Sequence, residues 1–366
     1  GKFLKEINAA NLVDLGISYL HDITTGLYNI PGYIAQDREQ YLGSVRYRHY
    51  GEQSDTTVVL YGRYGLMVAD SANALNATSP DVAAAGVPAA SRIAYRGDFF
   101  DRSVGFNVQN TRDLGERQKL TIGGEYLDGF MDMSNIYPAE PGRVQVTQGN
   151  VKRNAIFIQD EIRFGPVATQ LSGRFDRWET HGEFHDTKAS FPGQGNWDER
   201  SESAFSPKAG FAWRIADAWV LRGSIGKAFN TPDVSQLYGN SRRGGTTTAY
   251  GNPFLTPEKA LSRDLGLDFY LGQQAYVKSS IYYTTAEDFI YTINRTGVPA
   301  GTSVTDKANV GEVRARGAEL EGLWHTTSFI DLQGSFTWND SKVTSNPANT
   351  SLRSEEHTSE LQSRQC

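Results

Sequence analysis

Polar and apolar residues alternate with a period of two along most of the chain. In residues 330–338, every second residue is apolar or glycine and the residues between them are polar, and residues 167–175 follow the pattern less strictly. Alternate side chains of a strand point to opposite faces, so each segment has an apolar and a polar face. The chain also holds 37 Gly, 18 Tyr and 18 Phe, which strands and tight turns favour. These features predict an all-β protein.

About thirteen segments show this pattern, and each has roughly the 10-residue length of a membrane-spanning strand. Short links rich in turn residues alternate with long polar links along the chain. The predicted strands are residues 10–22, 39–50, 56–68, 100–112, 118–131, 151–164, 167–179, 204–215, 218–229, 262–271, 274–290, 307–325 and 328–340. The predicted long links are residues 23–38, 69–99, 132–150, 180–203, 230–261 and 291–306.

This order of short and long links is typical of up-and-down outer-membrane barrels, whose periplasmic turns are short and whose outer loops are long. No stretch reaches the roughly 20 consecutive apolar residues of a membrane helix. We therefore predict an antiparallel transmembrane β-barrel wall. A soluble β-sandwich is the alternative, but its loops would be shorter and more equal. The residues predicted to face lipid are Ile156, Ile158, Ile162, Leu171, Phe175, Ile330, Leu332 and Phe336.

Charge and motifs exclude several classes of protein. The formal net charge of −6 disfavours nucleic-acid binding, which needs a basic surface. No Ser-His-Asp order, phosphate-binding loop or Cys-x-x-Cys pair is present, so we expect no enzyme activity and no cofactor. His181 and His185 have the spacing of a helical metal site, but they lie in a predicted loop without helical period. We therefore predict that they are solvated and that the chain holds no metal.

Three stretches resemble the TonB-dependent outer-membrane receptors. They read GKAFNTPDVSQLYG from residue 226, GNPFLTPEKALSRDLGLD from residue 251 and NVGEVRARGAELEGLW from residue 309, and IFIQDEIRF at 156–164 is a weaker match. The matching residues are Phe229, Pro232, Leu237, Tyr238, Gly251, Asn252, Pro253, Leu255, Pro257, Glu258, Asp264, Leu265, Gly266, Asn309, Gly311, Gly317 and Glu319. Since proline cannot donate to a sheet, we interpret the prolines as marks of strand ends rather than as ligand contacts.

The resemblance implies a barrel of about 22 strands around an N-terminal plug. Residues 1–352 would then be about 13 of 22 strands of the barrel, an open sheet without the plug or either barrel end. Residues 353–363 read as the translation of a common short-read sequencing adapter. We therefore expect residues 353–366, with His357 and the single cysteine Cys366, to be a non-native tail.

The resemblance also implies active uptake across the bacterial outer membrane. The expected partners are outer-membrane lipid, a small-molecule or metal-chelate ligand, and the TonB complex, which would act through the missing N-terminal region. Siderophore-bound iron is the commonest cargo of the family, and cobalamin, other metal chelates and oligosaccharides stay open. A passive porin or a surface-adhesion barrel is the alternative function.

Candidate ligand contacts are loop residues whose chemistry suits a flat or anionic ligand. Arginine pairs bind carboxylates and catecholates, and aromatic rings stack on flat ligands. The candidates are Trp197 in loop 180–203 and Arg242, Arg243 and Tyr250 in loop 230–261. Alternation predicts that Arg174, Arg222, Glu319 and Glu321 face the lumen. There the two arginines would line the path or meet the plug, and the two glutamates would be solvated or paired with Arg314 or Arg316.

Overall fold

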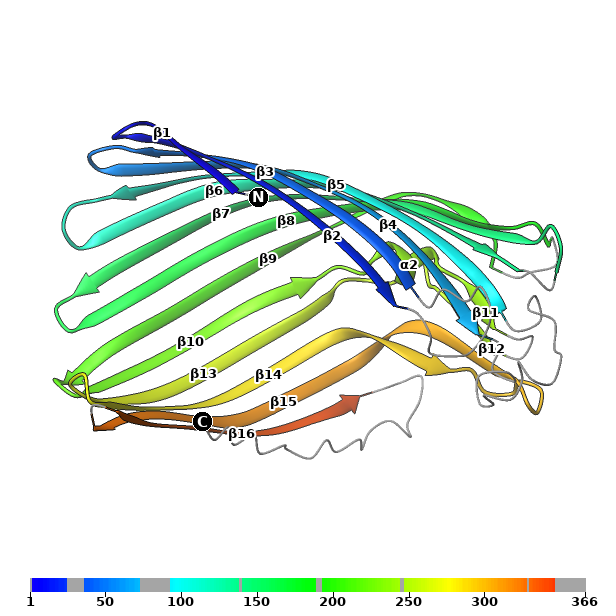
Figure 1. Cartoon of the computed structure of the whole chain (residues 1–366). Coiled ribbons are helices and arrows are strands. Elements are labelled where there is room, and N and C mark those ends of the chain that lie inside the picture. Colours follow the sequence, from blue (N-terminus) through cyan, green and yellow to red (C-terminus); the bar gives the residue numbers. More distant parts are fainter. Residues whose placement is uncertain are drawn as a thin grey trace.

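The computed structural model shows a single sheet that curves into a barrel wall (Figure 1). It describes residues 2–24, 36–72, 93–137, 140–188, 193–243, 247–327 and 329–345. Within these ranges, 16 strands belong to the sheet, and the long strands pair antiparallel with their neighbours along the chain. β1 and β16 end this series and do not pair with each other within the described residues. The predicted open, antiparallel up-and-down sheet is therefore confirmed.

Every strand predicted from the sequence is present, together with β1 at the N-terminal side and two short strands in the predicted loop 230–261. The bounds are β1 Lys2–Asn8, β2 Asn11–Thr24, β3 Gln36–Tyr50, β4 Ser54–Ala72, β5 Ile93–Asp113, β6 Gln118–Ile136, β7 Val144–Phe164, β8 Val167–Asp186, β9 Gly195–Ala216, β10 Trp219–Asn230, β11 Ser241–Arg243, β12 Thr247–Tyr250, β13 Glu258–Leu271, β14 Ala275–Asn294, β15 Ser303–Thr327 and β16 Ile330–Ser345. A short helix, α2 (Val234–Tyr238), lies between β10 and β11.

The short links all lie at one end of the barrel (Figure 1). The β7–β8 link is the pair Gly165–Pro166, and Gly165 has a φ of 57°. Gly272 begins the β13–β14 link with a φ of 56°. Residues with a Cβ rarely adopt this left-handed conformation, so glycine is what allows these turns to be so tight. The sequence located these turns to within a few residues.

At the other end, three of the predicted long loops are too long, and loop 291–306 is reduced to the residues between β14 and β15. Loop 132–150 is reduced to the residues between β6 and β7, and loop 180–203 to those between β8 and β9. The four strands continue beyond the region of clear alternation, because polar residues there occupy both faces. On β7, for example, buried Thr147 faces the interior and Gln148, with an amide hydrogen bond to Asp132, faces outward. A pattern that depends on contrast between the faces cannot detect such a strand.

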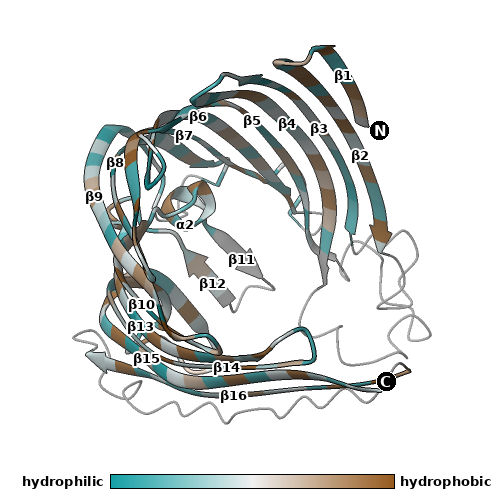
Figure 2. Cartoon of the chain, turned by 90° about the vertical axis from the view of Figure 1, so that its left-hand side faces the viewer, coloured by the Kyte–Doolittle hydropathy of each residue, from teal (hydrophilic) through white to brown (hydrophobic). Residues whose placement is uncertain are grey.

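The convex surface carries the apolar residues that were predicted to face lipid. Ile156 is 67% exposed and Leu171 is 54% exposed, although both are apolar. They lie on one continuous face, because Ile156 pairs with Phe175 and Ile158 pairs with Gly173. The opposite face surrounds α2, β11 and β12, which lie inside the wall (Figure 2). The apolar face is therefore the outer surface of the barrel.

The tips of β6–β9 are joined by a buried charged group, which we call the tip cluster: Tyr137, Arg143, Gln145 and Asp186. Arg143 donates from Nη2 to Asp186 Oδ2 at 2.8 Å, and both side chains are at most 4% exposed. Gln145 Nε2 donates to the same oxygen at 2.7 Å. The Arg143 guanidinium also lies 4.3 Å from the centroid of the Tyr137 ring. The two hairpins are thus held together by hydrogen bonds within a sheet that extends past the apolar surface.

The interior contains the apolar core of the described residues. It consists of Trp178 from β8, Val234, Leu237 and Tyr238 from α2, Leu255 from the link to β13, and Ile290 from β14. No helix among the described residues is long and apolar enough to cross a membrane. The core therefore depends on the segment between β10 and β13, which folds back into the barrel.

Candidate functional site

A pair of glycines forms the surface on which α2 lies. Gly149 on β7 and Gly182 on β8 are directly paired and both face the interior. A Cβ on Gly149 would lie 2.5 Å from Cγ1 of Val234, and a Cβ on Gly182 would collide with the ring of Tyr238. We call this pair the glycine seat. Because neither residue has a side chain, the helix can approach the wall closely.

The conformation of α2 is fixed by its first residues. Asp233 caps the helix: its Oδ1 accepts from the backbone N–H of Gln236 at 2.7 Å, and Gln236 Oε1 accepts from the Asp233 N–H at 3.0 Å. This reciprocal capping satisfies two backbone donors that an isolated five-residue helix would leave free. Pro232 precedes the cap, so β10 cannot continue. The short helix is therefore specified locally as well as by packing.

Aromatic side chains fill the space between α2 and the wall. Trp178 is fully buried and Tyr238 is 1% exposed. The ring of Trp197 stacks on Tyr238 with a centroid separation of 5.4 Å and an interplanar angle of 23°. The Tyr238 hydroxyl shares a hydrogen bond with Thr180 Oγ1 at 3.1 Å. Burial raises the pKa of Tyr238 above its usual range, although the hydrogen bond with Thr180 acts against this shift.

Arg200 on β9 adds a cation to this aromatic group. Its guanidinium lies 5.0 Å from the centroid of Trp178 and also donates to the carbonyl of Leu255. Glu202 approaches it at 3.7 Å. Two buried donors, Trp178 Nε1 and Arg200 Nε, have no acceptor among the described residues. Trp178 and Tyr238 are buried in the packing of α2 on the wall, so Trp197 and Arg200 are the members of this group that a flat anionic ligand could reach.

Asn309 connects the link before β13 to the far wall. Its Oδ1 accepts from the N–H of Thr256 at 2.9 Å, and its Nδ2 donates to the carbonyls of Thr256 and Asp288. Asp288 has a φ of 56°, and the register of β14 skips a residue there. The side chain of Asn309 therefore satisfies backbone groups of the link before β13 and of this irregular strand that the sheet ladder leaves free.

Two other residues of the family motif act in the same way. Glu258 Oε1 accepts from the N–H of Ile290 at 2.7 Å, and Asn252 Nδ2 donates to the carbonyl of Lys307 at 3.1 Å. Leu255, between them in the chain, is fully buried in the interior core. These contacts are with the protein's own backbone and core.

Tyr250 lies on β12, which pairs in parallel with β15 so that Tyr250 lies opposite Asp306. The guanidinium of Arg295 lies 4.9 Å from the Tyr250 ring centroid. Asp306 accepts from both Nε and Nη2 of Arg295, and this hydrogen bonding raises the Arg295 pKa. The phenol and the cation are therefore held together at the inner edge of β15.

The other predicted ligand contacts lie on strands. Trp197 does not lie in a loop: it belongs to β9, and its ring packs against α2 inside the barrel. Its position was wrong because β9 begins earlier than alternation indicated. Arg242 and Arg243 lie on β11, paired with Thr248 and Thr247. Their side chains lie outside what the structure describes.

His181 and His185 also belong to a strand, β8, and not to a loop. His185 Nε2 lies 2.8 Å from Asn196 Oδ1 on the neighbouring strand. Within the described part of the chain, no group of three or more metal-binding side chains is found.

Each of the charged residues predicted in the lumen has a partner on the wall. Arg174 contacts Glu125 at 2.5 Å and Asp176 at 3.0 Å. Arg222 contacts Asp268 at 3.1 Å. The pairs of Arg174 with Glu125 and of Arg222 with Asp268 cross from strand to strand, so they stabilise the wall as well as lining it.

The two glutamates on β15 are bound by hydroxyl groups. Glu319 accepts from Ser280 at 3.3 Å and Glu321 accepts from the Tyr276 hydroxyl at 2.6 Å. Of the two arginines expected as partners, Arg314 and Arg316, Arg316 instead donates to Asp340 at 2.9 Å. Side chains alternate between the two faces along a strand, so Arg316 points to the face of β15 opposite to the glutamates and cannot reach either of them.

Sequence reasoning missed Trp178, Arg200 and the glycine seat. Alternation along β8 places Trp178 on the inward face. This is the only feature of the sequence that indicates its position in the interior. The glycine seat requires the β7–β8 register, because the two glycines are neighbours only across the hairpin and not along the chain.

Comparison with known proteins shows the family to which the chain belongs. The family profile described as "TonB dependent receptor-like, beta-barrel" matches residues 7–358. The iron-regulated outer membrane virulence protein of Vibrio cholerae serotype O1 is 26% identical over 188 residues, covering 48% of this chain and 28% of that protein. The ferrichrome outer membrane transporter/phage receptor of Escherichia coli strain K12 is 23% identical over 207 residues, covering 57% of this chain and 24% of that protein.

Solved structures share the fold at low identity. The copper transporter OprC superposes with a TM-score of 0.74 at 17% identity, over 94% of this chain and 52% of that one. The chain thus spans about half the length of the solved transporter that it matches. The ferrichrome protein and the copper protein are named as transporters, and none of the three names is that of an enzyme.

Proposed function

Because this chain belongs to the TonB-dependent receptor β-barrel family of the bacterial outer membrane, we propose that it forms the barrel wall of an active-uptake receptor. The proposed cargo is an anionic metal chelate, with siderophore-bound iron first. One observation carries this choice: the segment between β10 and β13 folds into the interior (Figure 2), where its Tyr238 stacks on Trp197 and its Tyr250 lies beside the Arg295 guanidinium. Energy for uptake would come from the TonB complex.

Two of the relatives are named as transporters, of ferrichrome and of copper, and the third name mentions only regulation by iron. Their names differ in metal, so the comparison supports the class of cargo and not a single member of it.

A passive porin is less consistent with the interior. A pore needs a water-filled lumen, whereas here α2 and its flanking link are buried against the inner wall, with Leu237 and Leu255 fully inaccessible. A segment that occupies the lumen fits a receptor that binds its cargo and releases it on demand.

The proposed binding surface combines three features near the long-link end of the barrel. Trp197, partly exposed and backed by the buried ring of Tyr238, offers an aromatic surface, and Tyr250 offers a phenol beside Arg295. The β11–β12 hairpin carries Arg242 and Arg243 along the edge of β15. Guanidinium groups bind carboxylates and catecholates through paired hydrogen bonds. The hairpin would therefore supply the charge and the rings would supply the contact area.

The test is the double variant Arg242→Ala/Arg243→Ala in the full-length protein, with ferric catecholate and ferric hydroxamate siderophores as probes. We expect binding of the anionic catecholate to weaken about 10-fold or more at low ionic strength, the equivalent of one lost charge-assisted hydrogen bond. The loss should shrink as salt rises, because exposed charges are screened. The matched control is Arg112→Ala/Arg117→Ala, which removes two exposed arginines at the short-link end.

Equal catecholate affinity in the variant and the parent at low salt would show that the two arginines only solvate the hairpin. An equal loss in the control would show that net charge, and not the hairpin, attracts the ligand. Either result would remove the basis for an anionic chelate at this site.

A further inference from the structure

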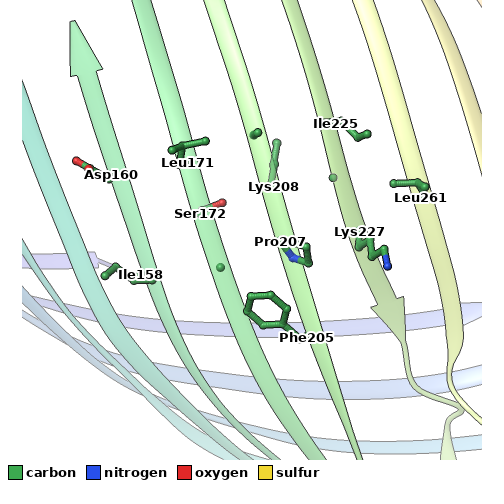
Figure 3. A pocket seen from close by; sticks show the side chains of 13 residues that line it. Ile158, Asp160, Leu171, Ser172, Phe205, Pro207, Lys208, Ile225, Lys227 and Leu261 are labelled. Atoms are coloured by element: carbon green, nitrogen blue, oxygen red, sulfur yellow. The ribbon is translucent and has the colours of Figure 1, made fainter.

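Two adjacent strands of the wall, β10 and β13, stop short of their neighbours at the long-link end (Figure 1). The pairing of β9 with β10 ends where Lys208 lies opposite Gly226, although β9 continues to pair with β8 as far as Gly195. Figure 3 shows this place, with Lys208 on β9 and Lys227 near the end of β10. Among the described residues, 195–207 of β9 therefore have no strand partner on this side.

The other side of this interruption is an edge of β14. The pairing of β14 with β13 ends where Glu287 lies opposite Lys259, although β14 continues to pair with β15 as far as Asn294. Residues 288–294 of β14 therefore also have no strand partner on one side within the described part of the chain. We call the space between these two strand edges the pairing gap.

Prolines specify the pairing gap in the sequence. Pro232 follows β10 after one residue, and Pro257 lies directly before β13. A proline has no backbone N–H to donate to a sheet ladder, so neither strand extends into the gap. The described residues between the two strands, 231–243 and 247–257, lie beside the gap instead. We call them the inserted segment.

The inserted segment covers the free edge of β9. The ring of Trp197 stacks on Tyr238 with a centroid separation of 5.4 Å. Arg200 donates to the backbone carbonyl of Leu255. Trp197 and Arg200 both belong to the part of β9 that has no partner from β10. Side-chain contacts therefore take the place of strand pairing on this edge.

The inserted segment is also bound on the β14 side of the pairing gap. Glu258, the first residue of β13, accepts from the backbone N–H of Ile290 at 2.7 Å, so a side chain satisfies a donor that no strand reaches. The Asn309 side chain on β15 accepts from the N–H of Thr256 and donates to its carbonyl, each at 2.9 Å. The edge of β14 and the neighbouring β15 are thus both connected to this region.

The two arms of the inserted segment are joined directly to each other. The N–H of Asn252 donates to the carbonyl of Gln236 at 2.9 Å, and the N–H of Gly251 donates to Asn240 Oδ1 at 2.9 Å. A Cβ on Gly251 would lie 2.9 Å from the carbonyl oxygen of Leu237, so the two backbones are in close contact. Contacts therefore run without interruption from β8 and β9 to β14 and β15.

We propose that the inserted segment is a fixed part of the barrel wall, which closes the pairing gap and stays in place while cargo is bound and released. Segments that move in binding have few buried contacts and a low free energy of local opening. Here Leu237 and Leu255 are fully buried, and the backbone is bound by side chains of β9 and β15. The movement that admits cargo then belongs to other segments. This inference goes beyond the proposed function, because it holds for any cargo.

The first test measures hydrogen exchange in the full-length protein without cargo. The amides of Leu237, Gly239, Asn252 and Leu255 each donate a hydrogen bond within the inserted segment. Their exchange rates, corrected for intrinsic rates, should lie within about 10-fold of those of β8, a difference of about 1.4 kcal/mol in opening free energy. Exchange as fast as in an unstructured peptide would overturn the proposal.

The variant Asn309→Leu removes both hydrogen bonds to Thr256. Exchange at Asn252 and Leu255 should accelerate about 10-fold or more, since each hydrogen bond contributes about 1 kcal/mol. The matched control is Asn110→Leu, which removes a hydrogen bond between β5 and β4 and should leave this exchange unchanged. Unchanged exchange in Asn309→Leu, or equal acceleration in the control, would overturn the proposal. If Asn309→Leu does not fold, the exchange of the parent decides.

A cross-link tests movement during uptake. Ala249 on β12 and Thr305 on β15 are direct partners, and neighbouring strands lie about 4.8 Å apart, which a disulfide can span. Cells with full-length Ala249→Cys/Thr305→Cys should take up a ferric catecholate equally well before and after reduction. A loss of uptake that reduction restores would overturn the proposal. If the parent takes up no chelate, the proposed function fails, and the exchange measurement alone decides this inference.

Discussion

The long-link end of the barrel is built in two different ways. Around β6–β9, the polar sequence extends the strands outward, and the tip cluster joins the two hairpins through Arg143 and Asp186. Between β10 and β13, a polar sequence of similar composition turns inward, and the glycine seat receives α2. The first region is stabilised by directional hydrogen bonds between charged groups. The second is stabilised by close packing of apolar side chains.

The contrast shows that polarity alone does not decide where a link goes. Pro232 prevents β10 from continuing, and Asp233 starts a helix in its place. No proline interrupts β8 before Asp186, so the strand continues to the tip. Proline and helix-capping residues determine where the strand ends. The shape of the wall opposite then determines whether the link can pack inside the barrel.

The largest expected effect comes from breaking the tip cluster with Arg143→Met. This leaves Asp186 as a buried charge without its partner, which costs about 3–5 kcal/mol. Hydrogen exchange of the amides at the tips of β6–β9 in the full-length protein should become faster, while exchange near the short links stays unchanged. The control is Lys119→Met, whose partner Asp113 lies 3.4 Å away in an exposed pair, and which should cost at most about 1 kcal/mol. Unchanged exchange at the tips would show that the cluster does not hold the hairpins together.

A smaller effect is expected from Gly182→Val in the glycine seat. Valine suits a strand, so β8 should be preserved, but its Cβ collides with Tyr238 and should destabilise the docking of α2 by about 1–3 kcal/mol. Limited proteolysis should then cut the full-length protein between β10 and β13. The control is Gly43→Val, because a Cβ at Gly43 meets no atom within 4 Å. Equal resistance in Gly182→Val and the parent would mean that the wall does not determine where α2 lies.

The smallest effect is a pH dependence of the tips. The hydrogen bond from Lys188 lowers the pKa of Glu140 below its usual range, with a further contribution from Arg143. A carboxyl group whose pKa is lowered by folding stabilises the fold above its unfolded pKa, and this contribution is lost as pH falls through the folded value. Hydrogen exchange at the β6–β7 tip, corrected for intrinsic rates, should therefore accelerate below about pH 4.3. In Glu140→Gln this part of the dependence should disappear, and its persistence would assign it to another carboxyl group.

Much of the wall could be predicted from the sequence, because one strand face meets an apolar surface and the other a polar interior. Residues 330–338 show this contrast at every position, and β16 is where it was expected. The contrast disappears in the outer part of β7, where buried Gln145 and Thr147 line the interior. The length of the projecting hairpins could not be predicted for that reason.

The interior site was predicted in part. The motif indicated Leu237 and Tyr238 as structural residues, and both are buried in the core. Trp197 was selected as an aromatic loop residue, yet it lies on a strand and stacks on Tyr238. The sequence could not show this contact, because it depends on how a five-residue helix meets strands that are distant in the chain.

The glycine seat also implies an order of events during folding. Gly149 and Gly182 belong to neighbouring strands that are joined by a two-residue turn, so their pairing closes a short loop. Helix α2 follows much later in the chain, and docking it closes a longer loop with a larger entropic cost. We therefore expect the β7–β8 hairpin to form first and to act as a template for the segment that fills the interior. If the glycine seat forms before α2 docks, the barrel wall can assemble around an empty lumen. The segment that contains α2 would then fill the lumen in the last step.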